Sequence, residues 1–295
     1  MSAVVFPNYR IFTDAASDLG LSMMEGLPPV TVIPMGVNIG DEVHTFGPSG
    51  DLSISRFYAL QRTGSFASTS QPSPDACAQA FEKALASGYD VLFLGLTSGV
   101  SGTVNAARLA AEELRETYPE RKIVCIDTLC ASVGEGFLVR EAARRQAGGM
   151  NLDELANWVE ENKLKVCHWF TVDTFEHLKH GGRVGAVSAA VGGMLNIKPL
   201  LHVTQEGVLS VAKKPRGSKQ AMRAQLEQMA DGWTPDLGKL VIIGHADNPL
   251  GAITLRDQVQ DRFPDAEIHT ADIGAVIGAH VGLGMLALIY WGTTR

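Results

Sequence analysis

Short apolar runs rich in β-branched residues alternate with stretches of helical periodicity along the first half of this chain. In one such stretch, apolar residues recur at helical spacing from Cys77 to Leu85 and form one helix face. Strands that alternate with helices favour a parallel sheet covered on both faces, and ligands bind such sheets beyond the carboxyl ends of the strands. We therefore predict an N-terminal three-layer α/β/α domain. Its strands are expected at Ile11–Thr13, Val30–Val37, Val91–Leu96 and Ile123–Asp127, and two further helices at 101–118 and 133–147.

The second half has a different pattern, and the change falls at Gly148-Gly149-Met150-Asn151. Asn151 is a favourable N-cap for the next helix, so we predict an N-terminal domain over residues 1–150 and a C-terminal domain over 151–295. Two apolar runs flank the turn residues 205–207 and predict an antiparallel hairpin. The second domain is therefore expected to be α/β with a mixed sheet. Its strands are predicted at 166–171, 197–203, 208–213, 240–244, 267–270 and 285–290.

The charge balance excludes some classes of partner. The 295 residues include 25 basic and 32 acidic side chains, which gives a net charge of −7. Nucleic acids and anionic membranes need a concentrated basic surface, so we expect neither as a partner. The apolar stretch 285–291 is far shorter than the roughly 20 residues that span a bilayer, and the first residues do not resemble a signal peptide. We therefore expect a cytoplasmic protein without stable membrane insertion.

Cysteine and histidine spacing argues against a disulfide scaffold and a metal site. The four cysteines contain no C-x-x-C pair and are too few for a chain of this length, so we expect buried thiols. The histidines show no H-E-x-x-H spacing and no cysteine partner. No metal and no other cofactor is predicted. The cysteines are Cys77, Cys125, Cys130 and Cys167.

Two clusters of hydroxyl residues precede predicted helices. In the first, residues 68–73, Ser73 suits the N-cap and Pro74 the first helical position, so a capped loop explains the pattern. The hydroxyls of this cluster, those of Thr69 and Ser70 among them, and the amide of Gln71 are nonetheless a reasonable set of neutral donors for an anion. The second cluster, residues 97–103, joins an apolar strand to a helix. Backbone N–H groups at such a turn bind anions, although an ordinary turn capped by Ser101 before Gly102 explains the same residues.

Arg183 and His280 are the other candidate site residues. Arg183 follows two glycines, which let the backbone approach a ligand closely, and its guanidinium can donate to a carboxylate or phosphate in a fork. A glycine helix end with a surface arginine is the alternative. His280 lies among glycine and aliphatic residues, where histidine is more often a hydrogen-bonded core residue than a catalyst.

Eight short segments, taken together and in order, resemble the DegV family across essentially the whole chain. They are T-D-A-A-S-D-L at 13–19, V-I-P-M at 32–35, T-S-Q-P-S at 69–73, S-G-V-S-G-T at 98–103, I-D-T at 126–128, G-G-R at 181–183, I-K-P at 197–199 and H-V-G-L-G at 280–284. The resemblance implies a two-domain protein that holds a long-chain fatty acid between its domains. In bacteria with a fatty-acid kinase, family members present the carboxylate to that kinase and carry the acyl phosphate onward.

The resemblance also implies roles for individual residues. Thr69 and Ser101 would bind the carboxylate, with Ser70 and the helix start at Gly102 beside them. Arg183 would offset the negative charge, and His280 would hydrogen-bond the head group. The chain departs from the family pattern at Ala15, Ala16 and Thr128, where hydroxyl residues or serine are usual. Small and flexible residues near these segments are candidates for the tunnel wall, and an ordinary core position is the alternative for each: Ala189, Ala190, Val191, Met194, Leu195 and Met285.

We therefore expect a fatty-acid-binding protein that is not itself an enzyme. Two alternatives remain open from the residues. One is a serine-type acyl hydrolase or acyltransferase with Ser101 as nucleophile, His280 as base and Asp14 or Asp127 as the orienting acid, although a G-x-S-x-G turn is missing. The other is a phosphotransferase that acts alone, for which no nucleotide-binding loop stands out.

Overall fold

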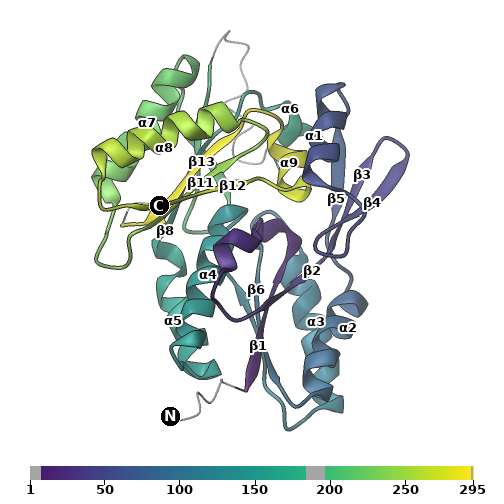
Figure 1. Cartoon of the computed structure of the whole chain (residues 1–295). Coiled ribbons are helices and arrows are strands. Elements are labelled where there is room, and N and C mark those ends of the chain that lie inside the picture. The colour runs from purple at the N-terminus through teal and green to yellow at the C-terminus, as the bar shows by residue number, and fades with distance from the viewer. Residues whose placement is uncertain (1–7, 184–196, 294) are drawn as a thin grey trace.

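Two large sheets and one smaller sheet, with helices between and around them, make up this computed structural model (Figure 1). The structure describes residues 8–183, 197–293 and 295. The predicted fold class is confirmed, because a parallel sheet forms in the N-terminal half and a mixed sheet in the C-terminal half.

The N-terminal sheet, sheet A, has four parallel strands in the order β2-β1-β6-β7. Helices α2 and α3 pack on the face that carries Phe12 and Phe93, while α4 and α5 pack on the face that carries Ile11 and Leu92. This arrangement confirms the three-layer prediction. The elements are β1 (Tyr9–Asp14), β2 (Val30–Ile33), β6 (Asp90–Gly95), β7 (Ile123–Asp127), α2 (Pro74–Ala86), α3 (Thr103–Thr117), α4 (Val133–Ala147) and α5 (Leu152–Asn162).

The C-terminal sheet, sheet C, has six strands in the order β10-β9-β8-β13-β11-β12, of which only the β11–β12 pair is parallel. Helices α7 and α8 cover its outer face, and the inner face looks toward α4. The predicted mixed sheet and its hairpin are confirmed. The elements are β8 (Val166–Thr171), β9 (Leu200–Val203), β10 (Leu209–Lys213), β11 (Leu240–His245), β12 (Glu267–Asp272), β13 (Leu286–Trp291), α7 (Gly217–Gly232) and α8 (Pro249–Arg262).

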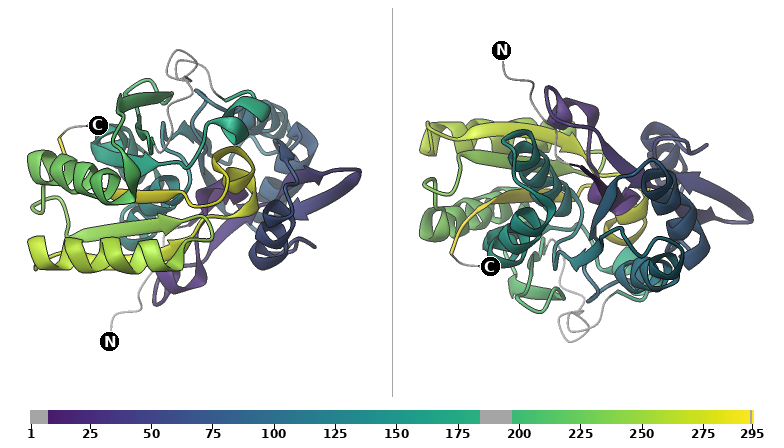
Figure 2. Two further views of the ribbon diagram at one scale, coloured as in Figure 1. Left: turned by 90° about the horizontal axis from the view of Figure 1, so that it is seen from above. Right: turned by 90° about the horizontal axis from the view of Figure 1, so that it is seen from below.

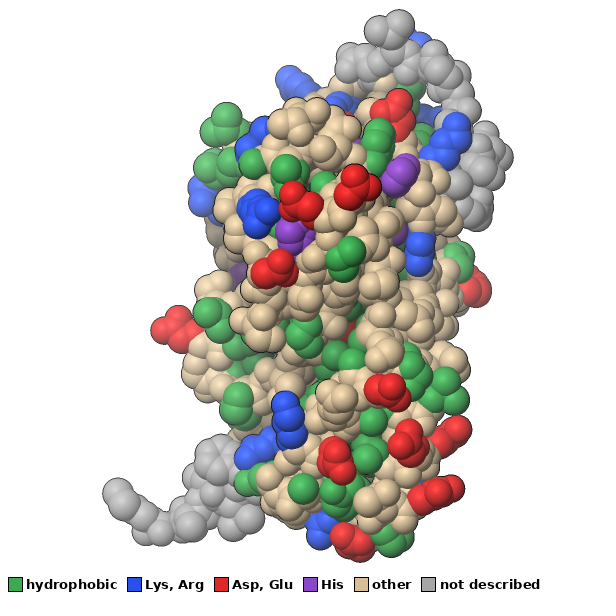
Figure 3. Space-filling model, turned by 90° about the vertical axis from the view of Figure 1, so that its right-hand side faces the viewer, with side chains coloured by type: hydrophobic (Ala, Val, Ile, Leu, Met, Phe, Trp, Pro, Cys, Tyr) green, Lys and Arg blue, Asp and Glu red, His purple; other side chains and the backbone are tan. Residues whose placement is uncertain are grey.

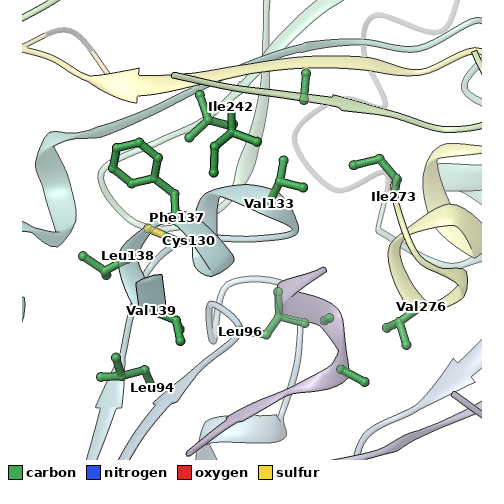
Figure 4. Close-up of a cluster of buried hydrophobic side chains, with 14 of the residues drawn as sticks. Leu94, Leu96, Cys130, Val133, Phe137, Leu138, Val139, Ile242, Ile273 and Val276 are labelled. Atoms are coloured by element: carbon green, nitrogen blue, oxygen red, sulfur yellow. The ribbon is translucent and has the colours of Figure 1, made fainter. Parts of the chain in front are cut away.

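Helix α4 lies between the two large sheets and is buried on almost every side. Figure 4 shows Val133 and Phe137 directed toward Ile242 of sheet C, while Val139 lies near Leu94 of sheet A. The helix carries glycine where neighbours come closest: a Cβ at Gly136 would lie 2.4 Å from the carbonyl oxygen of Ser17. One continuous apolar core therefore runs through both halves of the molecule.

The predicted strand Val30–Val37 is in fact two strands in different sheets. Pro34 has no N–H to donate, and the chain leaves sheet A there. The second piece, β3, pairs with β4 and β5 in a small sheet whose β3–β4 hairpin projects from the side of the molecule (Figure 2). Strand β5 includes Thr69, so the capped-loop interpretation of residues 68–70 was wrong, although Ser73 does cap α2. The elements are β3 (Met35–Ile39), β4 (Glu42–Phe46), β5 (Ala67–Ser70) and α1 (Ile54–Arg62).

Two short helices lie near the predicted site. Helix α6 (Glu176–His180) ends at Gly181, two residues before Arg183. His280 lies in the last turn of α9 (Ala275–Val281). The described residues also form three short 3₁₀ helices: η1 (Ala15–Ser17), η2 (Leu21–Met24) and η3 (Lys163–Lys165).

The predicted domain boundary falls between α4 and α5. Asn151 forms a full capping box with Glu154 at the start of α5, as expected of an N-cap. Helix α5 packs against sheet A, and the chain enters sheet C at β8. The division into residues 1–150 and 151–295 stays a prediction. In the parts of the chain that the structure describes, none of the helices combines the length and apolarity needed to cross a membrane.

Candidate functional site

A cavity of about 310 Å³ lies between the inner face of sheet C, helix α9, strand β5 and the turns before α3 and α4. Five of the six predicted site residues line it, although up to 211 positions separate them in the chain. Gly102 lies next to Ser101 at the start of α3 and does not itself line the cavity. The five are Thr69, Ser70, Ser101, Arg183 and His280.

Most of the remaining wall is apolar. Strands β8 and β13 contribute alternate residues to it, because side chains in a strand point to opposite faces in turn, and β9 contributes Val203. Met285, one of the predicted wall residues, is among them, whereas Ala189, Ala190, Val191, Met194 and Leu195 lie outside the described residues. The apolar wall includes Phe170, Leu178, Val203, Met285, Ala287 and Ile289.

Thr69 and His280 form a direct contact across the two halves of the chain. Thr69 Oγ1 lies 2.8 Å from His280 Nε2. Gly181 lies against the other side of the imidazole, where a Cβ would be 2.0 Å from Nδ1. Burial, and then the nearby charges of Arg183, His177 and His180, lower the pKa of His280 to about 4. The ring is therefore neutral at pH 7 and acts as a hydrogen-bonding group without a charge.

Ser101 lies in the turn that leads into α3. Its Oγ accepts a hydrogen bond from the backbone N–H of Thr103 at 3.2 Å and lies 2.8 Å from Thr103 Oγ1. When Thr103 donates in this bond, the hydroxyl proton of Ser101 remains for a ligand. Gly102 is the N-cap residue, and a Cβ there would lie 2.2 Å from Gln71 Oε1. The turn thus combines a hydroxyl with the positive end of a long helix.

Arg183 is held over the same turn. Its Nε donates to the carbonyl of Val100 at 3.1 Å, and Nη1 donates to the carbonyl of Gly181 at 2.6 Å. Gly181 ends α6 and Gly182 has φ +70°, so the predicted glycine helix end is present. These two bonds leave further guanidinium N–H groups to donate to an anion. Arg183 therefore supplies the positive charge beside the neutral His280.

The structure does not assemble the catalytic triad of the hydrolase alternative. Ser101 bonds to Thr103 and His280 to Thr69, and among the described residues His280 Nδ1 has no partner. The two candidate acids are used elsewhere: Asp14 accepts from the backbone of Ala16 and Leu96, and Asp127 from that of Ser98 and Leu129. Across the described ranges, no group of three or more potential ligands is arranged for a metal ion.

Three further polar residues line the wall: Gln71, whose amide belongs to the same candidate donor cluster as Thr69, and Ser132 and His168, which were missed in the sequence. Ser132 has φ +56° and donates at 2.6 Å to the partly buried Asp18, which also accepts from the backbone N–H of Gly274 at the start of α9. Burial raises the pKa of Asp18 to about 7. Neither this backbone conformation nor this link leaves a sequence signal. His168 does leave one, because it interrupts the apolar positions Val166 and Phe170 on one strand face.

Comparison with known proteins assigns this fold to a family. The model for the DegV family of uncharacterised proteins matches residues 8–292. This chain belongs to the DegV family. A DegV domain-containing protein of Clostridium perfringens is 37% identical to it over 287 residues, which cover 97% of this chain and 98% of that relative. The resemblance predicted from the eight segments is confirmed.

Solved structures of the family have the same fold. A fatty-acid-binding DegV family protein from Thermus thermophilus has a TM-score of 0.84 and 29% identity, over 97% of this chain and 100% of that one. The Streptococcus pneumoniae fatty acid kinase (Fak) B3 protein, loaded with linoleic acid, shares the fold with a TM-score of 0.85 and 23% identity, over 96% of this chain and 99% of that one. DegV of Bacillus subtilis, with a TM-score of 0.82 and 26% identity, is likewise a fatty-acid-binding protein.

Proposed function

We propose that this protein binds a long-chain fatty acid in the cavity, with the carboxylate at Thr69, Ser101, Arg183 and His280. One observation carries the proposal. The four residues form a continuous polar group, in which Thr69 contacts His280, His280 contacts Gly181, and Arg183 bonds to both Gly181 and the residue before Ser101. The rest of the wall is largely apolar, which suits one charged head and one hydrocarbon tail.

The apolar wall and the polar group contribute to binding in different ways. Each buried methylene contributes about 0.8 kcal/mol, so a dozen contribute on the order of 10 kcal/mol before the losses of ordering. The carboxylate must then find donors, since an unpaired charge in an apolar site is strongly unfavourable. Arg183 provides a charge-assisted hydrogen bond, and Ser101 and the Thr69–His280 pair can each provide one further donor.

The site also suits presentation of the carboxylate to a partner. We propose that a fatty-acid kinase phosphorylates the bound acid and that this protein carries the acyl phosphate, a proposal that draws on the fold shared with the pneumococcal kinase B3 protein. Arg183 would then offset the larger charge of the acyl phosphate.

Charged side chains of both signs are mixed on the face in Figure 3, and its histidines lie in the upper half. The described residues of this face form no continuous basic area of the kind that nucleic acid would require.

The first experiment is native mass spectrometry of the protein purified from its own cells, followed by denaturation and identification of the released molecule. We expect one fatty acid per chain. Empty protein should take up added palmitate or oleate, and the variant Arg183→Ala should take up less. A protein that is purified empty and also refuses both acids would contradict the proposal. For the kinase step, loaded protein, ATP and the kinase of the same cells should yield an acyl phosphate that hydroxylamine traps.

A further inference from the structure

Helix α9 belongs to the C-terminal half of the chain, yet side chains from the N-terminal half hold it in place. Tyr58 and Gln61 of α1 donate to backbone carbonyls just before the helix and within it, at 2.8 and 3.1 Å. A third bond runs from the backbone N–H of Gly274, at the start of α9, to Asp18 Oδ1 at 2.8 Å. These bonds bear on the site because α9 carries His280.

Asp18 also reaches a second wall of the cavity. Its other carboxylate oxygen, Oδ2, accepts from the hydroxyl of Ser132 at 2.6 Å, and Ser132 lines the cavity directly before α4. Asp18 follows η1, which packs against both α4 and α9. One planar carboxylate therefore sets the separation between the starts of α4 and α9.

The backbone around this carboxylate is unusual. Asp18 has φ +48° and Ser132 has φ +56°, and only four non-glycine residues in the described ranges have positive φ. Such conformations are unfavourable for residues other than glycine and are concentrated at ligand sites. Gly274 lies so close that a Cβ there would be 2.5 Å from Asp18 Oδ1 and 2.6 Å from the ring of Phe46. The start of α9 therefore has little freedom to move toward Asp18.

The contact between His280 and Thr69 depends on where α9 lies. His280 follows Gly274 by six residues, or about 9 Å along a helix, so a displacement at Gly274 is transmitted to the imidazole. Thr69 Oγ1 lies 2.8 Å from His280 Nε2, and a hydrogen bond weakens steeply as its distance and angle depart from the optimum. A small shift of α9 would thus disrupt the polar group that we assign to the carboxylate.

We propose that Asp18 is a positioning residue for the head group of the fatty acid. It holds α9 at the distance from α4 at which His280 meets Thr69. Asp18 is not among the described residues that line the cavity, so it acts through its two hydrogen bonds and not by touching the ligand. This inference rests on the proposed function, because the binding of a fatty acid is what it affects.

Asp18→Gly tests the proposal, because it removes the carboxylate and φ +48° suits glycine. By calorimetry, stearate should bind about tenfold more weakly, whereas methyl stearate, which has no carboxylate, should be little affected. NMR titration should show the pKa of His280 rising from about 4 toward its ordinary value, because water reaches a loosened ring. Asp18→Asn should restore most of the affinity, since its oxygen can accept from Gly274 and its amide can donate to Ser132.

Asp247→Gly is the matched control. Asp247 also has positive φ, at +51°, and its carboxylate accepts from Arg62 of the other half of the chain at 2.8 and 2.6 Å. Among the described residues it neither lines the cavity nor bonds to α9. Asp247→Gly thus removes a comparable bond between the halves. It should bind stearate like the wild-type protein and leave the pKa of His280 at about 4.

The outcomes separate this inference from the proposed function. Normal stearate binding by Asp18→Gly, equal losses for stearate and methyl stearate, or an unchanged pKa of His280 overturns the role of Asp18 and leaves fatty-acid binding intact. Refusal of every fatty acid by the wild-type protein overturns both. If Asp18→Gly does not fold, Ser132→Gly decides, because φ +56° also suits glycine. That variant must weaken stearate binding more than methyl stearate binding and raise the pKa of His280, and any other result rejects the inference.

Discussion

The polar and apolar regions of the cavity are built in opposite ways. The polar region takes Thr69, Ser101, Arg183 and His280 from four separate segments in both halves of the chain. The apolar region instead takes several residues from single elements, such as Ala287 and Ile289 from β13, which neighbours Phe170 on β8, and Val276, Ile277 and Val281 from α9. The polar region therefore exists only when both halves fold and meet. We expect the apolar region to set the affinity for a fatty acid and the polar region to set the preference for its charge.

Blocking the apolar region should have the largest effect. Ala287 lies opposite Phe170 on the inner face, so Ala287→Phe would place a ring in the cavity. Displacing about four methylenes removes about 3 kcal/mol, and stearate should bind at least about a hundredfold more weakly by calorimetry. Ala212→Phe, on exposed β10, should bind normally. Unchanged stearate binding by folded Ala287→Phe would show that the tail does not pass this wall.

The pH dependence of stability tests the neutral state of His280. Its pKa is about 4 in the folded protein and about 6.5 when unfolded, so the unfolded chain binds more protons between these values. Its contribution to the free energy of unfolding should therefore fall by about 3 kcal/mol from pH 7 to pH 4. Urea unfolding of the wild-type protein and of His280→Gln at several pH values isolates the contribution of His280 to the free energy of unfolding.

Other buried groups make the variant comparison necessary. The pKa of Asp14 is raised to about 6 and that of Asp18 to about 7, both chiefly by burial. The contribution of these carboxyls to the free energy of unfolding rises as the pH falls, because the folded protein binds their protons at a higher pH than the unfolded chain does. They are common to both proteins, so the difference between the two curves reports His280. Parallel curves would mean that His280 titrates normally.

Arg183→Ala should change the charge preference more than the affinity for the tail. Loss of a charge-assisted hydrogen bond is worth about 2 kcal/mol, so stearate should bind roughly thirtyfold more weakly while methyl stearate, which carries no charge, is little affected. Binding of both ligands to the wild-type protein, to Arg183→Ala and to the control Arg56→Ala checks this. Arg56 forms an exposed pair with Glu42. Equal losses for both ligands would contradict the division between the two regions.

The regular parts of this fold were predictable because local signals agreed. Strand β7 and helix α4 have the bounds that periodicity and flanking glycines indicated. The run Val30–Val37 was misjudged because hydrophobicity alone does not show that Pro34 moves the chain from one sheet to another. Residues 68–70 look like a loop because their side chains are polar, yet their backbone pairs with β3.

The candidate site was predictable only through family resemblance. No local pattern places Thr69 beside His280, because that contact depends on how α9 packs against β5. The positive φ of Ser132 and its bond to Asp18 likewise arise from tertiary packing. His168 is different, since an alternation argument on β8 would have marked it as a polar residue on the inner face.

The smallest effect we expect separates hydroxyl chemistry from shape in the polar region. Thr69→Val keeps the side-chain volume and removes the hydroxyl, which leaves His280 Nε2 without its partner at 2.8 Å. Stearate should bind about fivefold more weakly, or about 1 kcal/mol, by the same calorimetry. Thr69→Ser should restore most of the lost affinity for stearate. Thr45 is exposed on β4 of the same sheet, so Thr45→Val should not change the affinity. If Thr69→Ser binds as poorly as Thr69→Val, the methyl group and not the hydroxyl matters, and the carboxylate then relies on Ser101 and Arg183.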